Sequence, residues 1–510
     1  MKSAFSRIGV VGAGAMGRGI VQLYAQSGHP VVLHDAQPAA VDSAVRHLRD
    51  TFARLAEKGR LTAEQAQAAI GHVTPAASLQ DLAGCDLVIE AIVERIEIKR
   101  EMFIALEEIV GPDCVLVSNT SSLSITAIAA ACEHPGRVAG YHFFNPVPLM
   151  KVVEVVRGPR TEPSVVERLV QLTKVAGHTP VVCQDTPGFI VNHAGRGFGT
   201  EALRTLGEGV AEVPVIDRIL REQVAIGAQG GFKLGPFELM DLTGLDVSHF
   251  VMESIYHQYY EEPRYRPSVI GAQRVAAGLY GRKTGEGFYR HAGGAQQTPE
   301  EAAAPALPPG LRVWVAPSPA RDAIRELVTG LGAALDDGAV PAADSLLVVA
   351  PMGIDATTAS LGLDASRVVA LDTLFPYGLR ACKRRVLMST PATSAAALAA
   401  AHGLFAADGA RVSLLRDSPG FVAQRMVAMI VAIGCEIAQQ RIAAPADIDT
   451  AVRLGLGYPA GPLAIGDAIG PARVLEILSG MHQVTGDPRY RPSAWLRRRA
   501  QLGLSLLHED

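Results

Sequence analysis

A glycine-rich turn near the start of the chain constrains its fold more than any other feature. The apolar segment 7–11 predicts a buried β-strand, and a helix is expected from about Met16 to Ser27. Between them lie Gly12, Gly14 and Gly17, which have the spacing GxGxxG. A strand, a turn of this spacing and a helix in succession predict a dinucleotide-binding α/β domain.

Each glycine of this turn has its own physical role. Gly12 permits the tight turn, Gly14 lets the backbone approach a pyrophosphate, and Gly17 lets the helix pack on the strand. The helix also presents free N–H groups to the phosphates at its N-terminus, so Ala15 and Met16 belong to the expected cofactor site. The alternative is a glycine-rich turn that binds no ligand.

An acidic residue closes the next predicted strand, which covers residues 31–35. Asp35 is expected to accept hydrogen bonds from the ribose hydroxyls of a dinucleotide. Its negative charge would repel a 2′-phosphate. The sequence therefore favours NAD over NADP as the cofactor.

Composition excludes several classes of protein. The chain has 510 residues, of which 48% are hydrophobic, and this suits a globular α/β enzyme of several domains. A formal net charge of −4 gives no electrostatic argument for binding nucleic acid or an anionic membrane. The six cysteines lie far apart and lack metal-ligand spacing, so we expect neither disulfides nor a metal site. We expect a cytoplasmic protein without membrane-spanning segments.

The stretch 137–156 contains the residues most suggestive of catalysis. It predicts two strands, 137–144 and 151–156, joined by a proline-containing turn. Glu154 lies within a run of valines, where a carboxylate is costly unless it is paired. His142 at the end of the first strand is a suitable partner, and such a pair builds a general base. The alternative is a structural imidazole with Glu154 on an exposed strand edge.

Two further segments carry polar groups at places where ligands bind in α/β folds. A predicted strand at 114–118 leads into a polar loop that contains Ser121 and Ser122. These serines are either ligand contacts or simple turn and cap residues. Asp185 or Thr186 is expected to cap the helix that opens a second, helical domain, and Asn192 falls on the first turns of that helix.

The second half of the chain repeats the first. The segment Asp417–Phe421 echoes Asp185–Phe189, and Pro488–Ser493 matches Pro263–Ser268 letter for letter. A segment from Ala292 to Pro309, rich in Ala, Gly, Gln, Glu and Pro, predicts a linker between the halves.

The second copy lacks the residues that suggest chemistry in the first. Asp372 stands in place of His142, Arg384 in place of Glu154, and Gln424 in place of Asn192. No glycine fingerprint follows its first strand. We therefore expect a degenerate, catalytically silent Rossmann-like unit. The predicted domains are a Rossmann-type NAD-binding domain (1–184), an all-α domain (185–291), a linker (292–309), a degenerate α/β unit (310–415) and a second all-α domain (416–510).

Four motifs behind the fingerprint resemble those of L-3-hydroxyacyl-CoA dehydrogenases. They are Ser118–Leu123, His142–Pro146, Lys151–Val155 and Asp185–Asn192. The resemblance is close over residues 1–290. It implies NAD-dependent oxidation of an (S)-3-hydroxyacyl-CoA thioester to the 3-oxoacyl-CoA, with an acyl-CoA as the binding partner.

The resemblance also implies roles for individual residues. His142 is the general base, Glu154 its orienting partner, and Ser121 and Asn192 complete the substrate site. The family positions near NAD are matched by Asp35, Glu94, Lys99, Ser121, Asn145 and Lys283. The basic helical segment 39–69 would be an arm that meets coenzyme A; the alternative that its charges suggest is a solvated helical hairpin.

Two other functions remain open, namely a dehydrogenase of free hydroxy acids and a non-enzymatic NAD-binding relative. Related single-unit enzymes pair through their helical domains. A homodimer and a pseudo-dimer within one chain are therefore both compatible with the repeat.

Overall fold

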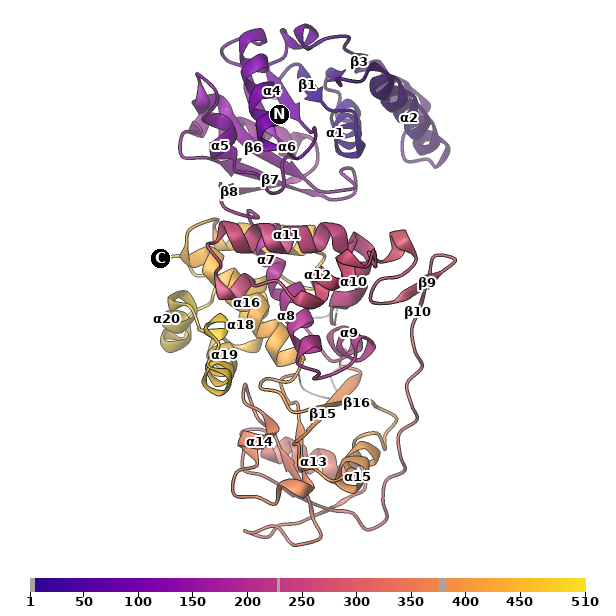
Figure 1. The fold of residues 1–510 in the computed structure, drawn as a ribbon, viewed down its shortest axis with the longest axis vertical. Coiled ribbons are helices and arrows are strands. Elements are labelled where there is room, and N and C mark those ends of the chain that lie inside the picture. The colour runs from indigo at the N-terminus through magenta and orange to yellow at the C-terminus, as the bar shows by residue number, and fades with distance from the viewer. Residues whose placement is uncertain (1–4, 227–229, 376–381) are drawn as a thin grey trace. The chain divides into compact units, whose positions relative to one another are not determined.

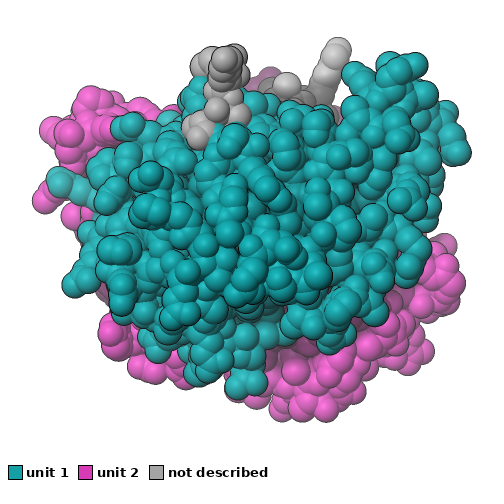
Figure 2. Space-filling model, turned by 90° about the horizontal axis from the view of Figure 1, so that it is seen from above, with its two compact units in different colours: residues 1–193, 440–456 teal, residues 194–439, 457–510 magenta. Residues whose placement is uncertain are grey.

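The computed structural model describes residues 5–226, 230–375 and 382–510. The chain divides into two compact units, coloured separately in Figure 2. Unit 1 comprises residues 1–193 and 440–456, and unit 2 comprises residues 194–439 and 457–510. Each unit contains its own β-sheet with helices (Figure 1). Within the described part of the chain, every helix is too short or too polar to span a membrane.

The sheet of unit 1 has eight strands in the order β3-β2-β1-β4-β5-β6-β7-β8. Neighbouring strands are parallel except for β6 and β7, which are antiparallel. This arrangement confirms the predicted Rossmann-type fold. The turn that is expected to bind the cofactor follows β1. The strands are β1 (Ile8–Val11), β2 (Val31–His34), β3 (Val73–Pro75), β4 (Leu87–Glu90), β5 (Val115–Ser118), β6 (Val138–Phe143), β7 (Val152–Arg157) and β8 (Thr179–Gln184).

Helices cover both faces of this sheet, because its strands are apolar on both sides. Val10 points into a core formed with α1, α2 and α6, whereas its neighbour Val11 points into a core formed with α4 and α5. The helices of unit 1 are α1 (Ala15–Gln26), α2 (Pro38–Glu57), α3 (Ala63–Gly71), α4 (Ile96–Ile109), α5 (Ile125–Ala129), α6 (Pro163–Val175) and α17 (Pro445–Gly455), with 3₁₀ turns η1 (Leu79–Leu82) and η2 (Pro135–Arg137); the short α7 (Val191–Ala194) begins in unit 1 and ends in unit 2.

A segment from the second half of the chain completes unit 1. Helix α17 packs on β7 and β8. The N–H of Gln184 donates to the carbonyl of Ile442 at 2.8 Å, and the N–H of Val182 donates to the carboxylate of Asp447 at 3.1 Å. Residues 440–456 thus satisfy the outer edge of β8, which would otherwise present unpaired backbone groups.

Asp185 caps a different helix from the one that the sequence predicted. Its carboxylate accepts hydrogen bonds from the Ser124 hydroxyl at 2.8 Å and from the Ile125 and Thr126 N–H groups, all at the start of α5. The prediction that Asp185 caps the following helix is wrong, because the chain first turns through Gly188 at a φ of 78° before α7 begins. The cap therefore connects the segment after β8 to the start of α5.

The sheet of unit 2 has six strands in the order β12-β11-β13-β14-β15-β16. The antiparallel pair β14–β15 corresponds to β6–β7, and the other pairs are parallel. In this described sheet β11 pairs directly with β13, so no strand takes the place of β4. The degenerate Rossmann-like fold is thus confirmed. Its strands are β11 (Arg312–Val315), β12 (Ala334–Leu335), β13 (Leu346–Val349), β14 (Val368–Leu371), β15 (Arg384–Ser389) and β16 (Arg411–Leu415).

Two sets of helices from the two repeats form the remainder of unit 2. Helices α8 and α16 pack closely where Gly197 meets Ile430, and a Cβ at Gly197 would lie 3.0 Å from the Ile430 Cα. The helices are α8 (Arg196–Gly207), α9 (Val213–Glu222), α10 (Pro236–Thr243), α11 (Leu245–Gln258), α12 (Val269–Ala276), α13 (Arg321–Gly330), α14 (Ala356–Ala359), α15 (Ala395–Phe405), α16 (Ala423–Gln439), α18 (Pro462–Ile469), α19 (Pro471–Thr485) and α20 (Ala494–Leu502). The 3₁₀ turns are η4 (Pro263–Tyr265), η5 (Arg282–Thr284), η6 (Ala365–Arg367) and η7 (Pro488–Tyr490).

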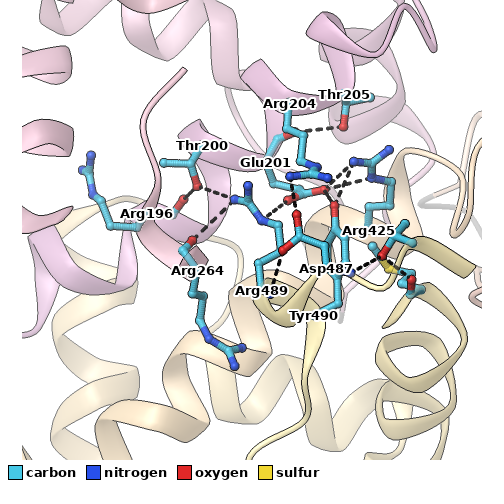
Figure 3. A network of polar contacts seen from close by, with 12 residues as sticks. Arg196, Thr200, Glu201, Arg204, Thr205, Arg264, Arg425, Asp487, Arg489 and Tyr490 are labelled. Carbon is cyan, nitrogen blue, oxygen red and sulfur yellow. Dashed lines mark hydrogen bonds and ion pairs between the residues drawn. The ribbon is translucent and has the colours of Figure 1, made fainter. Parts of the chain in front are cut away.

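A buried ionic network joins the two sets of helices (Figure 3). The fully buried carboxylate of Glu201 on α8 forms ion pairs with Arg425 on α16 at 2.8 Å and with Arg489 on η7 at 3.4 Å. The hydroxyl of Tyr490 also donates to Glu201, at 2.8 Å. Burial acts to raise the pKa of Glu201, but Arg425 and Arg489 hold it below its usual value. The network is therefore ionised and internally compensated.

The predicted linker begins within regular structure. Strand β10 (Ala295–Gln297) pairs with β9 (Arg290–Ala292) as an antiparallel hairpin. Further along, Glu301 forms an ion pair with Arg384 on β15 at 2.7 Å. The segment is thus held by a hairpin at its start and by an ion pair near its middle.

Candidate active site

His142 and Glu154 stand directly opposite each other on β6 and β7. Nδ1 of His142 lies 2.6 Å from Oε2 of Glu154. The two residues are 5% and 0% exposed, respectively. The alternative that Glu154 lies on an exposed edge is therefore wrong, since β8 continues the sheet beyond β7.

The second oxygen of Glu154 is also occupied. Oε1 accepts hydrogen bonds from the N–H groups of Ile190 and Val191, both at 2.9 Å. Because an ionised carboxylate only accepts, Nδ1 of His142 carries the proton that reaches Oε2. The ring tautomer set by this contact leaves Nε2 as a hydrogen-bond acceptor, which is the state that a general base requires.

Aromatic side chains enclose the imidazole. The ring centroid of Phe144 lies 4.4 Å from that of His142, and the centroid of Phe189 lies 5.8 Å away. These apolar contacts restrict the rotation of the ring and exclude water from one side of it. They strengthen the electrostatic coupling between His142 and Glu154.

Ser121 and Asn192 also lie together. The Asn192 side-chain Nδ2 donates to the carbonyl of Ser121 at 3.4 Å. Asn192 immediately follows Ile190 and Val191, the residues that bind Glu154. A single segment, 190–192, thus connects the general-base pair to the loop after β5.

Glu94 organises that loop. Its Oε1 accepts hydrogen bonds from the Thr120 hydroxyl at 2.6 Å, the Ser122 hydroxyl at 3.0 Å and the Ser121 N–H at 3.1 Å. Burial acts to raise the pKa of Glu94, but Lys99 and these three hydrogen bonds hold it below its usual value. The carboxylate is therefore ionised and fixes the conformation of the loop.

Lys99 reaches this loop from inside the fold. The residue is 1% exposed, and its ammonium lies 2.6 Å from Glu90 and 3.3 Å from Glu94. Sequence reasoning missed Glu90, which also accepts from the Ser118 hydroxyl at 2.6 Å. The signal was an acidic residue at the end of an otherwise apolar strand. Lys99 and Glu90 thus hold the loop in place through buried contacts with Glu94 and Ser118.

The glycine turn has the shape that a dinucleotide requires. Gly12 has a φ of 108°, and a Cβ there would lie 2.4 Å from the Ala91 carbonyl oxygen. A Cβ at Gly17 would lie 1.8 Å from the Gly12 carbonyl oxygen. Gly14 faces open space, because a Cβ there would meet nothing within 4 Å. The open position at the start of α1, which begins at Ala15, is where a pyrophosphate would approach.

Asp35 lies just after β2 and contacts this turn. Its Oδ2 accepts from the Ala13 N–H at 2.8 Å, and its Oδ1 accepts from the Gln37 N–H at 2.9 Å. The carboxylate therefore holds the glycine turn and stands where the ribose of a dinucleotide would lie. The residues present fit NAD.

Two of the expected cofactor residues, Asn145 and Lys283, are not among the residues that form these contacts. Asn145 is exposed, two residues after the end of β6. Lys283 lies on η5 of unit 2, where it forms an ion pair with Asp246 at the start of α11. Their contact with the cofactor stays a prediction.

The second copy shows what the same framework does without the catalytic pair. The buried carboxylate of Asp372, in the position of His142, accepts from the side chains of Gln223 and Gln424, both at 2.9 Å. Arg384, in the position of Glu154, forms ion pairs with Glu222 and Glu301. Both side chains are held by structural contacts, and neither is placed to act as a general base.

A dinucleotide-binding sheet with an oriented histidine at the carboxyl end of a strand defines a nicotinamide-dependent dehydrogenase. The chain belongs to the 3-hydroxyacyl-CoA dehydrogenase family. The NAD binding domain of that family matches residues 7–186, and its C-terminal domain matches twice, at 188–291 and 420–505. The protein is an NAD-dependent enzyme of this family.

Individual relatives share either the whole chain or its first half. The chain is 38% identical to the 3-hydroxyadipyl-CoA dehydrogenase of Escherichia coli (strain K12), over 97% of each protein. It is 42% identical to a probable 3-hydroxybutyryl-CoA dehydrogenase of Deinococcus radiodurans, over 56% of this chain and all of the relative. A crystal structure of 3-hydroxybutyryl-CoA dehydrogenase from E. coli K12 superposes with a TM-score of 0.84 at 36% identity and covers 98% of both chains.

Proposed function

We propose that this protein oxidises (S)-3-hydroxyacyl-CoA thioesters to 3-oxoacyl-CoA, with 3-hydroxyadipyl-CoA of bacterial phenylacetate degradation as its substrate. The observation that carries the reaction is the buried pair of His142 and Glu154 in an NAD-binding sheet. The observation that supports the substrate is the 38% identity, over 97% of the chain, with a 3-hydroxyadipyl-CoA dehydrogenase.

In the oxidative direction the 3-hydroxyl of the substrate donates a hydrogen bond to Nε2 of His142. The imidazole takes this proton as the hydride leaves C3, and bound NAD supplies the hydride acceptor. The imidazolium that forms is stabilised by Glu154 at 2.6 Å from Nδ1. Positioned proton transfer of this kind contributes about 10²–10⁴-fold to the rate.

The remaining site residues position the reactants. Ser121 and Asn192 are proposed to contact the reacting oxygen, since one segment joins them to the His142–Glu154 pair. Glu94 and Lys99 are proposed to hold the loop against the nicotinamide side of NAD. Asn145 and Lys283 complete the proposed cofactor contacts.

The arm formed by α2 and α3 is the proposed contact for coenzyme A. Arg46, Arg49 and Arg54 lie exposed on α2, and Lys58 and Arg60 lie exposed just beyond it. Exposed cations on one projecting hairpin attract the phosphates of coenzyme A. The arm therefore supports a thioester rather than a free acid as substrate.

NADH formation by purified protein tests the proposal, with 3-hydroxyadipyl-CoA and 3-hydroxybutyryl-CoA compared side by side. We expect a higher kcat/KM for the dicarboxylate and loss of turnover in His142→Ala. Preference for the short chain would place the enzyme with its 3-hydroxybutyryl-CoA relatives. Equal activity on the free 3-hydroxy acids would point to a free hydroxy acid dehydrogenase, and NAD binding without turnover would point to a non-enzymatic relative.

A further inference from the structure

Unit 2 contains a cavity of about 690 Å³, a size typical of small-molecule sites. Its walls come from the loop and helix that follow β11, the loop that follows β13, and the residues that follow β14. Strand β11 pairs with β12 on one side and with β13 on the other, so the cavity lies where the strand order reverses. Open α/β sheets bind their ligands at such a position, outside the carboxyl ends of the strands.

The cavity is unsuited to a dinucleotide. Pro317 and Pro319 stand in the loop where the first copy has glycines, and proline offers no N–H to a phosphate. Asp336, the acidic residue after β12, already accepts hydrogen bonds from the turn that follows it. Its carboxylate accepts from the Ala342 N–H and the Ser345 hydroxyl, both at 2.7 Å. The glycine turn that fits a dinucleotide in the first copy is therefore missing here.

Apolar side chains form most of the wall. They include Ala323 and Leu327 on α13, Val349 and Met352 on and after β13, and Leu371 and Phe375 on and after β14. Such a surface gains free energy when an apolar group replaces water against it. An apolar ligand body is therefore favoured.

The charged groups that line the cavity are already compensated. Arg384 forms ion pairs with Glu222 and Glu301, and Arg385 pairs with Asp408. Arg473 and Glu476 on α19 line the cavity with one charge of each sign.

The carboxyl group of Asp372 completes the charged lining. Its two oxygens accept hydrogen bonds from the side chains of Gln223 and Gln424, and burial raises its pKa. Arg384 and Arg385 are thus matched by opposite charges, and the Asp372 oxygens by hydrogen-bond donors.

Two buried polar atoms at the cavity, one on Gln223 and one on Ser318, lack a hydrogen-bond partner among the described residues. Gln223 is 1% exposed and lines the cavity; its Nε2 donates to Asp372, whereas its Oε1 accepts from none of the described residues. The hydroxyl of Ser318, in the loop after β11, is likewise unpaired among them. A buried carbonyl oxygen without a donor is costly, so a ligand that brings an N–H or O–H would relieve it.

We propose that this cavity binds an uncharged, largely apolar small molecule that carries a hydrogen-bond donor, and that it does so without catalysis. The degenerate sheet would then act as a binding unit that retains the position of the ancestral cleft but not its chemistry. The ligand donates a hydrogen bond to Oε1 of Gln223, and its apolar part packs against α13 and the loop after β13.

The probe for this site is N-phenyl-1-naphthylamine, which is uncharged, apolar and carries one N–H. Its fluorescence is titrated against the full-length protein. We expect saturable binding of one probe per chain. Ala323→Trp and Met352→Trp fill the cavity from two different walls, and each should weaken binding about tenfold or more. Glu326→Trp is the matched control, because Glu326 is exposed on the same helix and does not line the cavity.

Two further experiments distinguish binding in this cavity from binding at the dehydrogenase site. Saturating NAD and 3-hydroxybutyryl-CoA should leave the probe bound, and Ala323→Trp should leave kcat/KM for the thioester unchanged. The proposal is overturned by absence of saturable binding, by displacement of the probe with NAD or thioester, or by equal affinity in both cavity-filling variants and the control.

Discussion

The N–H of Gln184 on β8 donates a hydrogen bond to the carbonyl of Ile442, which belongs to the second repeat. The equivalent bond in unit 2 runs from the N–H of Arg416 to the carbonyl of Val210, which belongs to the first repeat. Helix α17 covers β7 and β8 in unit 1, and its counterpart α9 contacts β15 in unit 2. A helix from each repeat therefore packs on the sheet of the other repeat.

This exchange predicts the behaviour of a shortened chain, residues 1–291. Single-copy relatives correspond to the first half alone. The fragment lacks α17, so β8 has an open edge, while α9 has lost the sheet that it contacts. We expect α9 of one copy to cover β8 of another, which gives a homodimer. Light scattering after gel filtration should report twice the fragment mass, and a folded monomeric fragment would contradict the prediction.

Glu154→Gln should impair catalysis through the tautomer of His142. The amide of glutamine can donate to Nδ1, which would place the ring proton on Nε2, where the substrate hydroxyl must donate. We expect kcat to fall by at least about 10²-fold, with the affinity for NADH unchanged. Steady-state kinetics and NADH fluorescence titration measure the two quantities. A variant with near-normal kcat would remove Glu154 from the mechanism.

Asp35→Asn should relax the choice of cofactor. Asparagine keeps a carbonyl oxygen for the Ala13 N–H but removes the charge that repels a 2′-phosphate. Because a hydrogen bond to a charged group contributes about 1.5–3 kcal/mol, the preference for NAD over NADP should fall by roughly tenfold to a hundredfold. The ratio of kcat/KM values with the two cofactors measures this preference. An unchanged ratio would show that another residue discriminates between them.

The elements around the site were predictable because their signals are local. Two short apolar runs and the two prolines between them predicted the hairpin of β6 and β7, in which His142 pairs with Glu154. The glycine turn was equally local. Each of these predictions needed only a short window of sequence.

Contacts between distant segments were not predictable in this way. Nothing near Gln184 indicates that Ile442 will pair with it, and the cap that Asp185 provides for α5 depends on how two strands are placed. Lys99 was expected beside NAD by resemblance alone. Its burial between Glu90 and Glu94 follows from the packing of α4 against the sheet, which periodicity does not reveal.

Glu94→Gln should change how stability depends on pH. The folded protein holds the pKa of Glu94 below its ordinary value, so ionised Glu94 favours the folded state above the pKa of the unfolded chain. This contribution is lost as the pH falls through the lowered folded value. Urea unfolding at pH 7.5 should show a less stable variant, and the difference should shrink at acidic pH. A constant difference would mean that the charge of Glu94 is not responsible.

Arg425→Leu should destabilise unit 2 strongly. Glu201 is fully buried, and Arg425 contributes the 2.8 Å ion pair that compensates it. Removing one partner of a buried pair leaves an uncompensated charge, which costs about 3–5 kcal/mol. Arg290→Leu is the matched control, because its side chain is 75% exposed and its pair with Glu286 is a surface contact, which contributes at most about 1 kcal/mol. Urea denaturation followed by circular dichroism gives the free energy of unfolding of each variant. Equal losses in the two variants would show that the residual contacts of Glu201 with Arg489 and Tyr490 suffice to hold the charge.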